Sequence, residues 1–194
     1  MEEGAKLELR RQVFHIALGS AIMILVFHGL LNLKILMIVF FVGLAIAMVS
    51  LRSRIPCICW FLDKFERQNV FPGKGALFFI LGCIIVLVLF DTSIALASIA
   101  VLTFGDSLGP LIGLYKKKKG KKFNGRLVEG FIVAFVVSFL AAAFFVPMWV
   151  GVVGSFVALT FEFFEIKFRG RSVDDNLFVP LIAGSVMYIV MFVL

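Results

Sequence analysis

Long apolar runs separated by short polar or charged breaks make up almost the whole chain. A helix needs roughly 20 apolar residues to cross the hydrocarbon core of a bilayer, so runs of this length predict membrane-spanning helices. We expect about seven of them, near residues 11–32, 34–51, 75–90, 92–115, 127–146, 147–166 and 176–194. The pattern predicts an all-α fold in which residues 1–194 form one polytopic integral membrane helical bundle.

One connection between these runs has a different pattern. Residues 56–68 place apolar side chains on one helical face and charged side chains on the other. Trp60 is of the residue type that anchors at the boundary between membrane and water. We therefore expect a short amphipathic helix on the membrane surface, followed by a turn at Gly73 that delivers Lys74 to the mouth of the third span.

The distribution of charged residues predicts how the bundle is oriented in the membrane. The chain is 62% hydrophobic with a net charge of +7, a charge that in a soluble protein would suggest nucleic acid. Here the basic residues fall in alternate connections, with five between Arg52 and Lys74 and seven between Lys116 and Arg126. The positive-inside rule then predicts a cytoplasmic N-terminus and an external C-terminus, with no nucleic-acid partner.

Asp106 is the most unusual polar residue, because it lies inside the apolar run 92–115. A carboxylate within a membrane is costly and is rarely present without a function or a partner. Gly105, Gly109 and Pro110 beside it predict a helix that opens around Asp106 to admit a ligand. The four-residue spacing of the glycines equally permits close helix packing or a homodimer.

In the predicted topology, further polar residues gather near the cytoplasmic side. They are His15, Glu129, Glu162, Asp174, Asp175 and Asn176. Acids and bases that converge from several helices suit a charged ligand bound beside a lipid. Each also has a structural explanation: His15 as a satisfied polar residue, and Asp174 as a cap for the last helix. Adjacent acids with an amide are, however, also the hard oxygen ligands that Mg²⁺ prefers when phosphate completes its shell.

No standard nucleotide-binding motif is present, since neither Gly73–Gly75 nor Gly120–Lys122 has the phosphate-loop pattern. Phosphoryl transfer nevertheless requires only a metal held by carboxylates and cations around the phosphates. The first four lysines of the basic loop are explained by topology and anionic head groups. Residues that could supply the parts of a phosphate site are Lys74, Asp106, Lys121, Lys122, Arg126, Asp174 and Asp175.

The polar motifs also occur in a familiar order along the chain. The ordered set consists of Arg11–His15, Glu66–Arg67, Pro72–Gly75, Phe104–Gly109, Arg126–Gly130, Glu162 and Asp174–Leu177. This set resembles the dolichol kinase-like family, which includes CTP-dependent polyprenol, phytol and diacylglycerol kinases. It is also similar in motif style to the phosphatidate cytidylyltransferases.

The resemblance implies a membrane enzyme that transfers the γ-phosphate of CTP to the hydroxyl of a lipid alcohol, with Mg²⁺ as the cofactor. It implies that Asp106 is a metal ligand or the base, and that Asp174 and Asp175 complete the metal site. The expected catalytic residues are Asp106, His15 and Glu162. The expected nucleotide-binding residues are Lys74, Gly105, Gly109, Lys121, Lys122, Arg126, Glu129 and Asn176. Leu127 stands where such proteins commonly carry Ser or Thr.

Two other functions stay open at this point. A CTP:lipid-phosphate cytidylyltransferase would leave the cytidine on the lipid and release pyrophosphate. A small ion-coupled transporter would use the intramembrane acids to carry a cation or a proton. The outer half of the predicted bundle has few acids to continue such a path, which favours the kinase.

Overall fold

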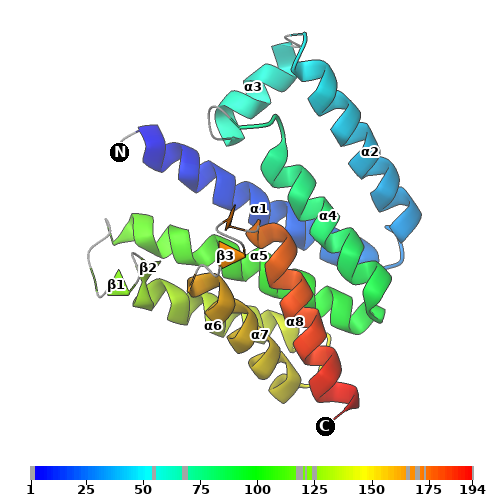
Figure 1. Cartoon of the computed structure of the whole chain (residues 1–194), viewed down its shortest axis with the longest axis vertical. Coiled ribbons are helices and arrows are strands. Elements are labelled where there is room, and N and C mark those ends of the chain that lie inside the picture. The colour runs from blue at the N-terminus through cyan, green and yellow to red at the C-terminus, as the bar shows by residue number, and fades with distance from the viewer. Residues whose placement is uncertain are drawn as a thin grey trace.

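The computed structural model of the chain describes residues 3–53, 56–66, 70–116, 120, 122–123, 126–164, 167–168, 171–172 and 174–193. These residues form a helical bundle (Figure 1) made of α1 (Glu3–Phe27), α2 (Leu33–Ser50), α3 (Pro56–Phe65), α4 (Lys74–Leu89), α5 (Thr92–Tyr115), α6 (Val128–Ala142), α7 (Met148–Phe163) and α8 (Asp175–Phe192). Two antiparallel hairpins with two-residue strands join them, namely β1 (Lys122–Phe123) with β2 (Arg126–Leu127), and β3 (Lys167–Phe168) with β4 (Arg171–Ser172). The predicted all-α architecture is confirmed.

Each predicted apolar run forms a helix, but the helices differ in length. By length and composition, α1, α2, α5 and α8 could each cross a membrane. The helices α4, α6 and α7 have 16, 15 and 16 residues, and 16 residues rise only about 24 Å. Turns take up the ends of the predicted runs, as in the residues that precede Pro147. Within the described residues the structure therefore supports a bundle with four helices of spanning length, and the seven expected spans are not confirmed.

The central helix of the bundle is α5, which packs against α1, α4, α6, α7 and α8. Within its most apolar stretch 67% of residues are buried, against 11% for α2, which lies at the periphery on α4 (Figure 1). Small residues allow this packing: a side chain on Gly19 of α1 would collide with Thr103 of α5. By contrast, α2 exposes large apolar side chains such as Phe41 and Met48, which suits contact with lipid.

The expectation that the helix opens around Asp106 is wrong. The helix α5 is continuous from Thr92 to Tyr115 and includes Pro110. Because proline has no N–H, the carbonyl of Asp106 does not receive the hydrogen bond that residue 110 would otherwise donate. The packing of α5 against its neighbours keeps the turns on either side of this lost bond helical.

Glycines of α5 lie where other helices pack against it. A side chain on Gly105 would collide with Leu159 of α7, and a Cβ on Gly130 of α6 would lie 3.0 Å from the carbonyl oxygen of Gly109. The structure therefore shows close helix packing at Gly105, whereas a Cβ on Gly109 would meet nothing within 4 Å, so the approach of a ligand to the backbone there stays a prediction.

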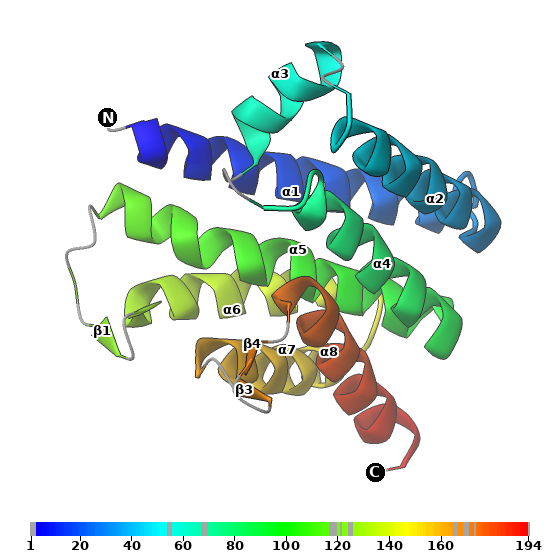
Figure 2. The same cartoon turned by 45° about the horizontal axis from the view of Figure 1, so that its top comes forward.

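The amphipathic helix α3 lies over the N-terminal half of α1 (Figure 2). It ends at Phe65, earlier than expected. Its aromatic face packs on α1, since the ring of Phe14 lies 5.3 Å from that of Phe61 and 5.5 Å from that of Phe65. Trp60 is 60% exposed on the outer face, with the Lys64 amine 5.3 Å from its ring. The apolar face of α3 is thus shared between the bundle and a cavity beneath it.

Candidate functional site

A cavity of about 210 Å³ lies where α3 and the start of α4 meet α1, α5 and the start of α8. The polar part of its lining includes Lys74, Asp106 and Asp174. The aromatic part includes Phe14, Phe61 and Phe65. The cavity therefore joins charged groups and apolar surface within one small space.

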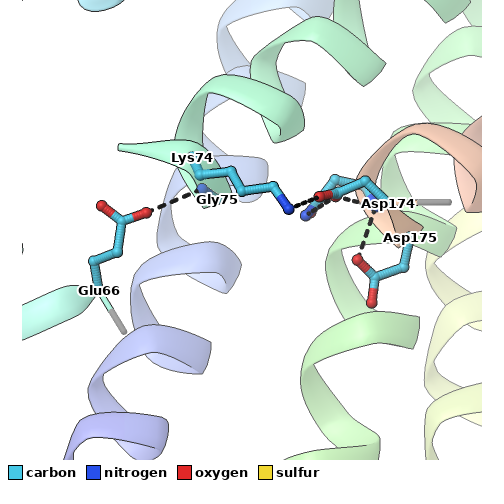
Figure 3. A network of polar contacts seen from close by, with 6 residues as sticks. Glu66, Lys74, Gly75, Asp174 and Asp175 are labelled. Atoms are coloured by element: carbon cyan, nitrogen blue, oxygen red, sulfur yellow. Dashed lines mark hydrogen bonds and ion pairs between the residues drawn. The ribbon is translucent and has the colours of Figure 1, made fainter. Parts of the chain in front are cut away.

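The turn that opens α4 presents Lys74 to this cavity. Gly73 caps the helix with φ +72°, in the left-handed region that glycine adopts at little cost. The backbone N–H groups of Gly73 and Gly75 both donate to the Glu66 carboxylate, the second over 3.3 Å (Figure 3). Since the first N–H groups of a helix have no partner within it, Glu66 acts as a remote cap that holds the turn in place.

The lysine pairs with the start of α8. Its Nζ lies 3.3 Å from Oδ2 of Asp174, whose side chain is only 15% exposed (Figure 3). The other oxygen of Asp174 accepts from the backbone N–H of Asn176 at 3.3 Å and from its side-chain amide at 2.9 Å. Asp174 is thus the cap of α8 and also a cavity residue.

Asp175 and Asn176 complete this corner of the cavity. The Asp175 carboxylate accepts from the backbone N–H of Asn176 at 3.1 Å. Asn176 is buried, and its side-chain oxygen has no hydrogen-bond partner within the part of the chain that the structure describes. The Asn176 carbonyl lies so close to Gly82 of α4 that a side chain there would collide with it. This contact fixes the start of α8 beside the middle of α4.

His15 forms part of the cavity wall on α1 and is buried. Its Nδ1 lies 3.1 Å from the carbonyl oxygen of Arg11. Because a carbonyl only accepts, Nδ1 carries a hydrogen, and the neutral ring then has its lone pair on Nε2. The ring packs edge-on against Phe79 at 5.4 Å. A fixed imidazole with an available acceptor nitrogen is the form that a general base requires.

Arg11 is the second permanent cation of the described cavity lining. Its Nη2 lies 2.8 Å from the Glu8 carboxylate, which also accepts from the Gln12 amide at 2.7 Å. Glu8 therefore holds both side chains on the same face of α1.

The charges around the cavity decide what can bind. Among the described lining residues, four carboxylates (Glu66, Asp106, Asp174 and Asp175) outnumber the permanent cations Arg11 and Lys74. A phosphate-bearing ligand would therefore enter most favourably with a cation. Within the described ranges, no three His, Cys, Asp or Glu side chains form a ready metal cluster. Mg²⁺ is usually held by one or two carboxylates together with waters and substrate phosphates, and the aspartates of this cavity fit that donor set.

The comparisons with known proteins place the chain in a family. No protein-family model matches it, and no solved structure matches it. Uncharacterized protein MJ1137 of Methanocaldococcus jannaschii is 32% identical to it over 183 residues, which cover 93% of this chain and 92% of that protein. The chain belongs to the MJ1137 family. The similarity covers nearly all of both proteins.

In this member of the MJ1137 family, the cavity brings together six of the residues expected from sequence. They are His15, Lys74, Asp106, Asp174, Asp175 and Asn176. These residues come from α1, α4, α5 and the start of α8. The expectation that they converge is therefore supported by their positions.

Other expected site residues lie elsewhere. Glu129 is in the first turn of α6, 3.2 Å from the Lys116 amine, and Lys122 is exposed in β1. Glu162 is one residue before the end of α7, and it is not among the described residues that line the cavity. Lys121 and the side chain of Arg126 lie outside what the structure describes.

Sequence reasoning gave no separate role to Glu66, Arg11 or the three phenylalanines of the cavity. Glu66 precedes a turn with two glycines, but the sequence does not show that the partners of its carboxylate are backbone N–H groups. The phenylalanines gave no such signal, because a residue that lines a cavity and one that faces lipid are equally apolar.

Proposed function

We propose that this protein is a Mg²⁺-dependent membrane phosphotransferase that uses CTP to phosphorylate a lipid alcohol of the polyprenol type. The observation that carries the proposal is that Lys74, Asp106 and Asp174 line the same cavity as three phenylalanines. CTP as the donor and polyprenol as the acceptor rest on the resemblance to the dolichol kinase-like family. The MJ1137 family would then be a family of lipid kinases.

The polar side of the cavity supplies the parts that phosphoryl transfer needs. Lys74 and Arg11 would contact phosphate oxygens, and one or two of the cavity aspartates (Asp106, Asp174 and Asp175) would hold Mg²⁺ together with water and phosphate oxygens. When bound, Mg²⁺ would neutralise charge on the phosphate oxygens. Phosphate binding would draw Lys74 away from Asp174, and this exchange of partners would leave the carboxylate available to the metal.

In the transfer itself, the hydroxyl oxygen of the lipid attacks the γ-phosphorus. The bond between that phosphorus and the β,γ-bridging oxygen breaks, and CDP leaves with the electron pair. His15 accepts the hydroxyl proton at Nε2, which the hydrogen bond between Nδ1 and Arg11 leaves as the acceptor.

The size of the cavity indicates that only part of each substrate enters it. Its volume of about 210 Å³ is below the roughly 300–1,000 Å³ of pockets that enclose a whole small-molecule ligand. It would enclose the reacting groups only, while the nucleoside extends into water and the lipid chain towards the bilayer. In the orientation that the basic loops favour, the cavity opens to the cytoplasm, where CTP is available.

Purified protein in detergent, given CTP, Mg²⁺ and a polyprenol, tests the proposal. With label on the γ-phosphate the lipid should become labelled, and with label on the cytidine it should not. Labelled cytidine on a lipid phosphate would instead indicate a cytidylyltransferase. No transfer to polyprenol, geranylgeraniol or diacylglycerol, together with ion flux in proteoliposomes, would favour the transporter.

A further inference from the structure

The aromatic side of the cavity has a definite construction. Phe61 and Phe65, one turn apart on α3, stack with their ring centroids 4.8 Å apart. Phe14 of α1 meets Phe61 at an angle of 74°. We call Phe14, Phe61 and Phe65 the aromatic wall. Together they form an apolar surface that directly adjoins the charged groups of the same cavity.

This wall continues to the outside of the molecule. Phe61 is 37% exposed and Val70 is 42% exposed, and both line the cavity. Exposed apolar residues at the mouth of a charged cavity would be unfavourable in water. In a chain whose long apolar helices suit a bilayer, the same residues offer a path from the membrane to Lys74 and Asp106.

The opposite face of α3 differs. Trp60 is 60% exposed and carries Lys64 against its ring, an arrangement suited to the boundary between membrane and water. A helix with Trp60 outside and Phe61 and Phe65 beneath it lies at the level where a lipid headgroup meets its hydrocarbon chain. The aromatic wall therefore faces the part of a lipid that follows the headgroup.

We propose that the aromatic wall is the acceptor subsite, which binds the first apolar segment next to the hydroxyl of a lipid alcohol. The lipid enters past Phe61 and Val70, and the wall holds its chain so that the hydroxyl reaches the polar side. A nucleobase is the competing occupant, but Phe61 and Phe65 already cover one face of each other's ring, which reduces the surface for stacking. This assignment rests on the proposed function for the identity of the acceptor.

Kinetics with alcohols of increasing chain length test the assignment. In Phe61→Ala and Phe65→Ala, kcat/KM for geranylgeraniol should fall about tenfold, because buried contact with an aromatic ring is lost. The KM for CTP should not change. The fall in kcat/KM should be smaller with dimethylallyl alcohol than with geranylgeraniol. Trp60→Ala is the matched control, as it removes a larger ring from the opposite face of the same helix. A fall in kcat/KM for geranylgeraniol in Trp60→Ala equal to that in Phe61→Ala and Phe65→Ala would overturn the proposal. A change in these two variants that is confined to a higher KM for CTP would also overturn it.

Photo-cross-linking of the unaltered protein provides a readout that needs no catalysis or variant. A labelled prenol with a diazirine near its hydroxyl should attach to residues 56–66, and excess geranylgeraniol should prevent the attachment. If geranylgeraniol prevents the labelling of α3 but no phosphate is transferred, the kinase activity is contradicted and the lipid subsite is supported. Transfer without competed labelling of α3 would overturn the subsite alone.

Discussion

Two lysine–carboxylate pairs in this protein have nearly the same geometry but different surroundings. Lys74 and Asp174 are 3.3 Å apart, and Lys116 and Glu129 are 3.2 Å apart. The lysine side chains are 45% and 40% exposed. The carboxylates differ, since Asp174 is 15% exposed and Glu129 is 35% exposed.

The surroundings explain why only one pair is assigned to the site. Asp174 caps α8 and shares a cavity with Asp106 and His15, whereas Glu129 lies beside the β1–β2 hairpin. Exposed ion pairs contribute on the order of 0–1 kcal/mol to stability, so neither pair is explained by stability alone. The difference teaches that ion-pair geometry does not identify a site, whereas convergence of further charged groups around the pair does.

The largest expected effect is a difference in kcat between variants of a cavity carboxylate and of a carboxylate outside the cavity. Asp106→Asn removes a charge from the cavity while keeping the size of the side chain, and it should lower kcat for lipid phosphorylation by roughly 100-fold or more. Glu129→Gln, outside the cavity, should have a much smaller effect. Initial rates of label transfer measure both variants, and near-normal turnover in Asp106→Asn would make Asp106 a structural residue.

The second prediction compares the lysines. Lys74→Met should lower kcat/KM for CTP about 10- to 100-fold, the range for a lost hydrogen bond to a charged group. Lys116→Met removes an equally exposed lysine and should stay within about threefold of the unaltered protein, as expected for a surface pair. Similar losses in the two variants would contradict the division into site and surface.

A third variant tests whether the fold positions the site. Gly82→Ala adds a Cβ that collides with the Asn176 carbonyl and should shift the start of α8 away from Lys74. We expect a stability loss of about 1–3 kcal/mol, seen in thermal unfolding, and a lower rate of transfer. Gly4→Ala is the control, because nothing lies within 4 Å of its new Cβ. Unchanged activity in Gly82→Ala would show that the spacing of α4 and α8 is not critical.

The smallest expected effect concerns the remote cap. Glu66→Ala leaves two N–H groups of the α4 turn without their acceptor and should cost about 0.5–2 kcal/mol of stability. Glu66→Gln retains an acceptor oxygen and should lose less. Denaturation of both variants in detergent measures the difference, and equal stability of Glu66→Ala and the unaltered protein would exclude a capping role.

The helices were predictable because apolar runs and charged breaks are visible in the sequence. Their neighbours were not, since α2 and α5 are both strongly apolar and yet α2 lies at the periphery of the bundle and α5 at its centre. The effect of Pro110 was also misread, because packing around α5 compensates for the lost hydrogen bond. Sequence could not show that turns at the ends of α6 and α7 shorten the spans predicted at 127–146 and 147–166.

The site was partly predictable for a related reason. Charged side chains such as Asp106 and Asp174 are conspicuous in an apolar sequence, and the alternation of basic connections predicts that they lie near the same side of the membrane. The partners of Glu66 are backbone N–H groups, which every residue except proline carries and which leave no mark in a sequence. Separation of Glu129 from the cavity depends on how α6 packs against α5, which only the fold determines.

The most direct test is one assay of phosphate transfer from γ-labelled CTP to a polyprenol, with the unaltered protein, Lys74→Met and Lys116→Met side by side. The account predicts labelled lipid with the unaltered protein and with Lys116→Met, and a rate at least about tenfold lower with Lys74→Met. Unlabelled lipid with the unaltered protein would contradict the proposed activity. Labelled lipid at equal rates in all three would contradict its assignment to this cavity.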